Sequence, residues 1–98
     1  MWSRAQSMPL FAEPEHSGLE FADFLYDYNM KTDAVTEYER YLYHRTDGAD
    51  ADYALFRMAM AMIDLGDLRG ARKSLDKLSV SSKQERHSIA ARLIAALI

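Results

Sequence analysis

Three aspartates near the middle of the chain, Asp47, Asp50 and Asp52, form the densest group of side chains able to hold a cation. A calcium-binding loop needs oxygen ligands at alternating positions, a glycine at its sixth position and a glutamate at its twelfth. The spacing around these aspartates meets none of those requirements. We therefore expect them to cap helices, and we expect no metal.

The other polar residues offer no catalytic arrangement. His16, His44 and His87 are isolated in the sequence, and without an HExxH pattern we expect surface or helix-capping histidines. Three glutamates between positions 13 and 20 lack the apolar surroundings that raise a carboxyl pKa. The chain contains no cysteine, no glycine-rich phosphate loop and no GxSxG motif. These observations predict a protein that is not an enzyme and uses no cofactor.

The composition is that of one ordinary globular domain. The chain has 98 residues, of which 49% are hydrophobic and 28% charged, with a net charge of −3. Nucleic-acid binding requires a basic surface, so the charge argues against that class of partner. Residues 1–16 carry both prolines and have no apolar stretch long enough for a signal peptide or a membrane span. We expect a loosely ordered arm there. The sequence does not distinguish a cytoplasmic protein from a periplasmic one.

A periodic apolar pattern between Tyr53 and Leu78 is the strongest structural signal in the chain. Apolar residues recur every three or four positions in two runs, as on one face of an α-helix. Between the runs, Gly66 accepts the left-handed conformation that ends a helix, and Asp67 can cap the next one. The pattern predicts two antiparallel helices. Their expected inward residues are Leu55, Met58, Ala59, Met62 and Leu65, then Leu68, Ala71, Leu75 and Leu78.

Three further helices are expected, so the fold class is all-α with about five helices and no strands. Ser17 and Glu20 form a capping box that opens a helix to about residue 29. A second helix follows over about 31–44, Asp50 is expected to cap the third, and Ser82 with Glu85 forms a capping box for the last. The expected inward residues are Phe21, Ala22, Leu25 and Tyr28, then Ala34, Tyr38, Tyr41 and Leu42, and finally Ile89, Leu93, Ala96 and Leu97.

The chain repeats itself with an offset of 37 residues. Two small residues lie twelve apart in each copy, with a turn residue seven positions after the first. Large apolar residues also recur in register. A random chain would seldom keep so many turn and apolar positions aligned. The matching pairs are Phe21 and Met58, Ala22 and Ala59, Leu25 and Met62, Asn29 and Gly66, Ala34 and Ala71, Tyr38 and Leu75, and Tyr41 and Leu78.

This pattern resembles the tetratricopeptide repeat family. The family's two small residues match Ala22 and Ala34 in the first copy, and its turn glycine matches Gly66 in the second. The period exceeds the family's period of about 34 residues, and the loop over 44–49 accommodates the difference. The resemblance implies antiparallel helical hairpins stacked as a short α-solenoid. Repeat one would span 17–45, repeat two 50–79, and a capping helix 82–98, within one domain over 17–98.

The resemblance also implies a binding groove. In the family, the first helices of the repeats line a concave groove that holds a peptide or a helix of another protein. Methionine and aromatic side chains there would suit an apolar or aromatic ligand segment, and the aspartates would favour a basic flank. The alternative is that the apolar helix over 53–65 is simply enclosed by its neighbours. The matching positions are Leu19, Asp23, Tyr26, Asp27, Tyr53, Phe56, Met60, Ile63 and Asp64.

The last expected helix leaves two functions open. Its apolar residues either cap the open end of repeat two or pair with a second copy of the chain. The first function is a non-enzymatic module that binds a partner protein or peptide. The stretch over 21–43 resembles repeats of bacterial envelope-associated proteins, which implies an envelope assembly. The alternative is a structural subunit that self-associates as a homodimer, through the groove or the last helix, with no separate ligand.

Overall fold

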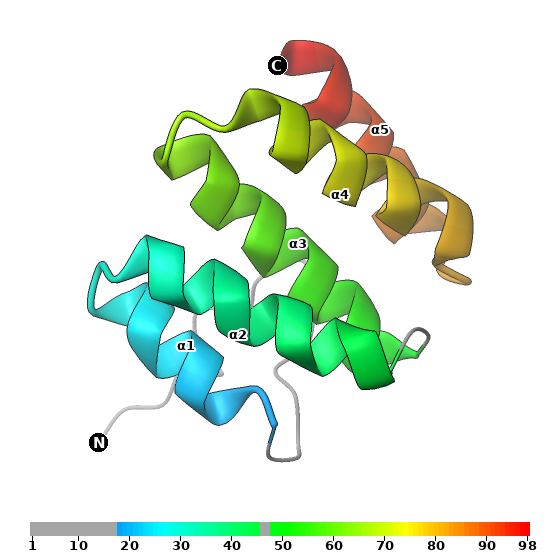
Figure 1. Ribbon diagram of the computed structural model, residues 1–98. Helices are drawn as coiled ribbons and strands as arrows, with labels where there is room; N and C mark the ends of the chain where they lie inside the picture. The colour runs from blue at the N-terminus through cyan, green and yellow to red at the C-terminus, as the bar shows by residue number, and fades with distance from the viewer. Residues whose placement is uncertain (1–17, 46–47) are drawn as a thin grey trace, which may run out of the picture.

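The structure is a computed structural model that describes residues 18–45 and 48–98. These residues form five helices and no strand (Figure 1), so the expected all-α class is confirmed. The expected arm over 1–16, the Ser17 cap and Asp47 lie outside the described residues. The helices are α1 (Glu20–Asp27), α2 (Lys31–His44), α3 (Ala49–Asp64), α4 (Leu68–Ser81) and α5 (Glu85–Leu97).

Each helix packs mainly against the next one along the chain. Helices α1 and α2 form one hairpin, α3 and α4 form a second, and α5 covers the far side of α4 (Figure 1). Helix α3 therefore lies in the middle, and α1 and α5 lie at opposite ends. The largest fully buried side chains are Tyr38, Leu19, Leu75 and Leu78.

The two hairpin turns share the same backbone geometry. Asn29 has φ of 64° and Gly66 has φ of 84°, both in the left-handed region. The next residue after each turn donates its N–H back to the preceding helix, from Met30 to the Leu25 carbonyl and from Asp67 to the Met62 carbonyl, both at 2.8 Å. The expected turns at both positions are therefore confirmed, with the same bonds at an offset of 37 residues.

Helix capping follows the predictions only in part. The Asp67 side chain accepts the Gly70 N–H at 2.9 Å, as expected. Asp50 lies inside the first turn of α3, whose N-cap is Gly48, so the expected Asp50 cap is wrong. The second capping box is wrong as well, since α5 begins at Glu85 itself. Ser82 still closes α4, donating its N–H to the Leu78 carbonyl, and is too early to cap α5.

Equivalent positions of the two repeats share their environment where the hairpin helices cross. Both pairs of alanines are fully buried, and so are Tyr38 and its counterpart Leu75. Phe21 and Met58 differ, because Phe21 is 58% exposed whereas Met58 is only 6% exposed. Helix α3 lies between the α1–α2 hairpin and α4, whereas α1 lies at the end of the stack and has neighbours on one side only. The expected inward positions of Phe21 and Tyr28 are therefore wrong.

The face of α5 that packs against the core is opposite to the one that was expected. Ala91 is buried and Ile94 packs against the core, whereas Ile89, Leu93, Ala96 and Leu97 are exposed. Both faces of this helix are apolar, so periodicity alone cannot select the buried one. Two polar contacts accompany the observed orientation. The Ser88 hydroxyl donates to the Ser79 carbonyl at 2.7 Å, and His87, expected at the surface, is buried 4.0 Å from Asp52.

Candidate functional site

The residues of the expected α1–α3 groove separate into three environments. Leu19 and Tyr53 are buried in the core, so their side chains offer no surface to a ligand. Phe56, Met60 and Ile63 on α3 are half-buried and pack against the core. The remaining four, Asp23, Tyr26, Asp27 and Asp64, belong to polar contacts between α1, α3 and the start of α2.

Asp23 is the centre of a buried polar cluster. Its carboxylate accepts hydrogen bonds from the hydroxyls of Tyr38, on α2, and of Tyr53, on α3, the latter at 3.0 Å. Burial, together with the hydrogen bond to Asp23, raises the pKa of Tyr38 well above its ordinary value. The phenol therefore stays protonated at neutral pH and remains a donor to the carboxylate. This cluster joins three helices through one buried carboxylate.

Arg57 supplies the positive charge for this cluster. Its Nε donates to the Tyr38 oxygen at 3.2 Å and lies 3.6 Å from the Asp23 carboxylate. Its Nη2 donates to Asp27 at 3.2 Å, and its guanidinium lies 3.8 Å from the centre of the Tyr26 ring. The sequence analysis did not predict that Arg57 and Tyr38 take part in a polar cluster. The available signal was Arg57 on the otherwise apolar helix over 53–65, together with Asp23, which lies between two residues expected to be buried.

A second cation pairs with the last acidic residue of the expected groove. Lys31 lies 3.4 Å from the Asp64 carboxylate, and its Nζ lies 4.3 Å from the centre of the Tyr26 ring. Asp27 and Asp64 are therefore already paired with cations of the chain itself. The rim that was expected to attract a basic ligand is occupied by internal ion pairs, which hold α1 and α2 against α3.

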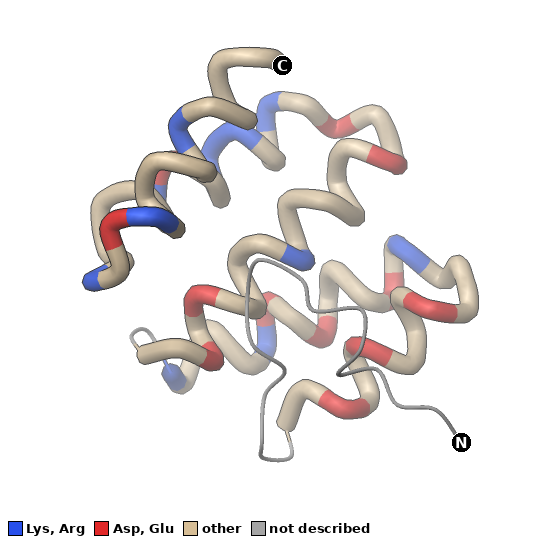
Figure 2. Tube along the Cα trace, turned by 180° about the vertical axis from the view of Figure 1, so that it is seen from behind, with Lys and Arg blue, Asp and Glu red and all other residues tan. Residues whose placement is uncertain are grey.

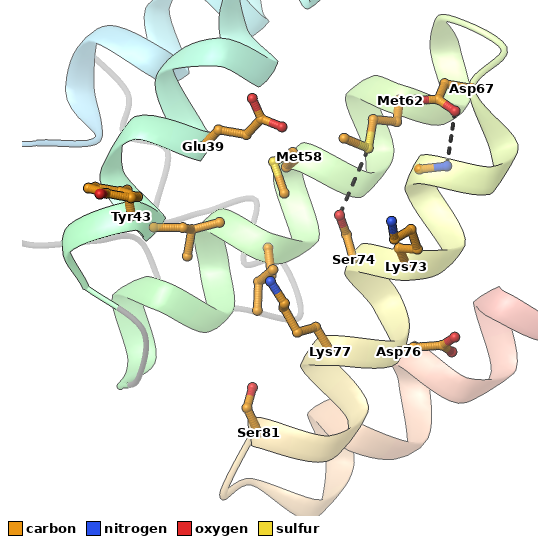
Figure 3. A pocket seen from close by; sticks show the side chains of 13 residues that line it. Glu39, Tyr43, Met58, Met62, Asp67, Lys73, Ser74, Asp76, Lys77 and Ser81 are labelled. Atoms are coloured by element: carbon orange, nitrogen blue, oxygen red, sulfur yellow. Dashed lines mark hydrogen bonds between the residues drawn. The ribbon is translucent and has the colours of Figure 1, made fainter.

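A different groove runs between α2 and α4, with α3 as its floor (Figure 3). Its volume is about 940 Å³, and the sequence analysis did not predict it. No sequence signal marks it, because its apolar residues other than Tyr43 were all assigned to the core. The residues that line it are Glu39, Leu42, Tyr43, Leu55, Met58, Met62, Asp67, Gly70, Lys73, Ser74, Asp76, Lys77 and Ser81.

The α2–α4 groove combines an apolar floor with charged walls. Met58 and Met62 lie along the floor, and the Ser74 hydroxyl lies 3.8 Å from the Met62 sulfur. Lys73 and Lys77 extend from α4, and Glu39 extends from α2 on the opposite side (Figure 3). Within residues 18–45 and 48–98, none of these three charged side chains forms an ion pair, so their charges remain available to a ligand.

Two further findings concern metal ions and membranes. Among the described residues, no group of three or more histidines, aspartates or glutamates is placed to hold a metal ion. No helix in the same part of the chain is both long and apolar enough to cross a bilayer.

The described residues form an all-α stack of helical hairpins with an open groove between α2 and α4. No family model matches the chain, and searches of curated proteins and of solved structures find no match either. The functional argument therefore rests on the geometry of the described residues.

Proposed function

We propose that this protein is a non-enzymatic, tetratricopeptide-like module that binds a segment of another protein. The repeat supports the proposal, since the positive-φ turns, the paired turn bonds and the buried alanines recur at an offset of 37 residues. Helical repeat proteins of this kind use extended grooves to bind partners. The observation that carries the proposal is the open, methionine-floored groove between α2 and α4.

The α2–α4 groove is a better partner site than the expected α1–α3 groove. In the α1–α3 groove, Leu19 and Tyr53 are buried, and Asp27 and Asp64 pair with internal cations. In the α2–α4 groove, the charged residues at the walls keep their charges available. Methionine side chains adapt their shape to a ligand, which suits a surface that accepts a helix.

The charges at the walls specify the chemistry of the partner. Lys73 and Lys77 on the α4 wall would attract acidic side chains, and Glu39 on the α2 wall would attract a basic one. The apolar floor requires an apolar face between those two edges. The partner segment is therefore an amphipathic helix with leucine-like residues on one face, glutamates along one edge and a lysine or arginine along the other.

A synthetic peptide tests this proposal directly. The probe is a helix of 14 residues, the length of α4, with leucines on one face, glutamates along one edge and lysines along the other. Its binding is measured by fluorescence anisotropy. We expect saturable binding, and we expect Lys73→Glu combined with Lys77→Glu to weaken it by about tenfold or more, because like charges then face each other.

The matched control changes Arg69 and Arg72 to glutamate. These two residues also lie on α4 and are exposed, but they do not line the groove. The control therefore makes the same change in net charge and should leave binding within about threefold of the unmodified chain. Absence of binding to the unmodified chain, or equal losses in the two double variants, would contradict this site.

A further inference from the structure

Helix α1 carries an exposed aromatic face at one end of the stack. Phe21, Phe24 and Tyr28 follow one another along the outer side of the helix, and all three are exposed. The Phe24 ring centre lies 4.5 Å from that of Tyr28 and 6.5 Å from that of Phe21. Glu20, which is exposed, precedes the aromatic residues in the first turn. The outer face of α1 is thus aromatic, on a helix that has no lysine or arginine.

Helix α5 carries an exposed aliphatic face at the other end. Ile89, Leu93 and Leu97 lie four residues apart, so they form one stripe along the helix. Leu93 is 63% exposed and Leu97 is 83% exposed. The exposed basic residues of this helix are Arg86 and Arg92, and Arg86 falls on the same face as the stripe.

Exposed apolar faces at both ends are unusual for a stack of helical hairpins. The terminal elements of such proteins normally present a polar outer face, which keeps them soluble. Contiguous apolar patches on a folded surface commonly mark interaction sites. Helices α1 and α5 lie at opposite ends (Figure 1), so one copy of the chain cannot cover either face with the other.

The two halves of the molecule have opposite charge. Helices α1, α2 and α3 carry nine acidic and three basic side chains, whereas α4 and α5 carry six basic and two acidic ones. The net charges are therefore −6 and +4. Figure 2 shows this separation, with the acidic residues gathered on α1 to α3 and the basic residues mainly on α4 and α5. The negative charge therefore lies at the α1 end of the stack and the positive charge at the α5 end.

We propose that the protein self-associates head to tail, with the α5 stripe of one copy on the α1 aromatic face of the next. The occupant of each face is a second copy of this chain, because the apolar surfaces match and the charges are opposite. Pairing α5 with α5 would bring Arg86 and Arg92 near their own copies. Pairing α1 with α1 would do the same for acidic residues, so the mixed pairing is favoured.

A head-to-tail contact has a defined consequence for assembly. Each copy offers one α1 face and one α5 face, so the contact is heterologous and leaves a free face at each end. Association then continues past the dimer as concentration rises, unless the geometry closes a ring. This surface is separate from the α2–α4 groove, and the inference does not depend on the proposed partner.

Mixing two blocked variants tests the inference. Leu93→Glu adds an acidic residue to the α5 stripe and leaves α1 intact. Phe24→Gln replaces the central ring of the α1 face with an uncharged polar side chain and leaves α5 intact, so the two blocked faces do not attract each other in the mixture. We expect the weight-average mass of the unmodified chain to increase between about 5 μM and about 500 μM in sedimentation experiments. This concentration range covers the dissociation constants expected for a small interface. Each variant alone should stay monomeric, and an equimolar mixture should form a dimer and nothing larger.

The controls separate the contact from unfolding. Val80→Glu changes an exposed apolar residue of α4 outside both faces and should associate like the unmodified chain. Leu97→Glu and Tyr28→Gln repeat the two blocks at more exposed positions. They replace the first pair if circular dichroism shows that either of those variants unfolds at a lower temperature than the unmodified chain. An unmodified chain that stays monomeric overturns the inference. A mixture that stays monomeric while the unmodified chain associates overturns it as well, and indicates pairing of like faces.

Discussion

The two hairpins have the same backbone plan but different interiors. The α1–α2 hairpin buries Asp23 and Tyr38, whereas the equivalent positions of the α3–α4 hairpin are Met60 and Leu75. The turns and the small residues at the helix crossings are nevertheless alike in both. The comparison shows that the repeat fixes local geometry, whereas the neighbours of each hairpin decide whether its side chains are polar, apolar or exposed.

The polar interior of the first hairpin depends on a residue of the second. Arg57 on α3 compensates the charge of Asp23 and also reaches Asp27 on α1. The second hairpin requires no such partner, because its equivalent positions are apolar. The contact between the hairpins therefore includes a buried ion pair as well as apolar packing, and the stability of the first hairpin depends on the second.

Removing Arg57 should have the largest effect on stability. We expect Arg57→Ala to lower the free energy of unfolding by about 3 kcal/mol, because it leaves the nearly buried Asp23 carboxylate without its cation. Urea denaturation measures the change. The matched control is Arg40→Ala, which breaks an exposed pair with Glu37 and should cost less than about 1 kcal/mol. Similar losses in the two variants would contradict a buried ion pair between the hairpins.

Overpacking the helix crossings should sharpen the difference between the hairpins. Ala59 and Ala22 are equivalent and both fully buried. We expect Ala59→Leu to destabilise the protein by about 1–3 kcal/mol, and Ala22→Leu to cost less, because α3 is enclosed on both sides and α1 can shift outward. Thermal denaturation of the two variants gives the comparison. A neutral Ala59→Leu would mean that the repeat register is wrong.

The fold was largely predictable because its signals are local. Left-handed turn residues, small residues at crossings and apolar periodicity all act within about a dozen residues, so Asn29, Gly66, Ala59 and Ala71 could be assigned from the sequence. The orientation of α5 could not be, because both of its faces are apolar. The expected Ser82 cap failed because Ser82 closes α4 and lies before Gln84, the residue at which α5 is capped.

The candidate site was less predictable because it depends on contacts between distant segments. The Asp23 cluster joins α1 with residues 15 and 30 positions away in the chain. Asp23, Asp27 and Asp64 were expected at a ligand-binding rim, yet the structure gives each of them an internal partner. The groove between α2 and α4 likewise depends on the separation of two helices, which no local pattern encodes. Burial and pairing decide what remains available to a partner.

The buried tyrosine of the first hairpin should give the smallest effect, seen as a dependence of stability on alkaline pH. The pKa of Tyr38 is raised in the folded protein above its ordinary value of 10.0, so the folded state keeps this proton where the unfolded state loses it. Its contribution is complete below pH 10 and is lost as the pH rises further, at up to about 1.4 kcal/mol per pH unit. Denaturation between pH 8 and pH 11 measures the slope of the free energy of unfolding against pH.

Tyr38→Phe should flatten this slope, whereas Tyr28→Phe should leave it unchanged, because Tyr28 is exposed and lies outside the Asp23 cluster. Equal slopes in the two variants would place the alkaline sensitivity outside the first hairpin.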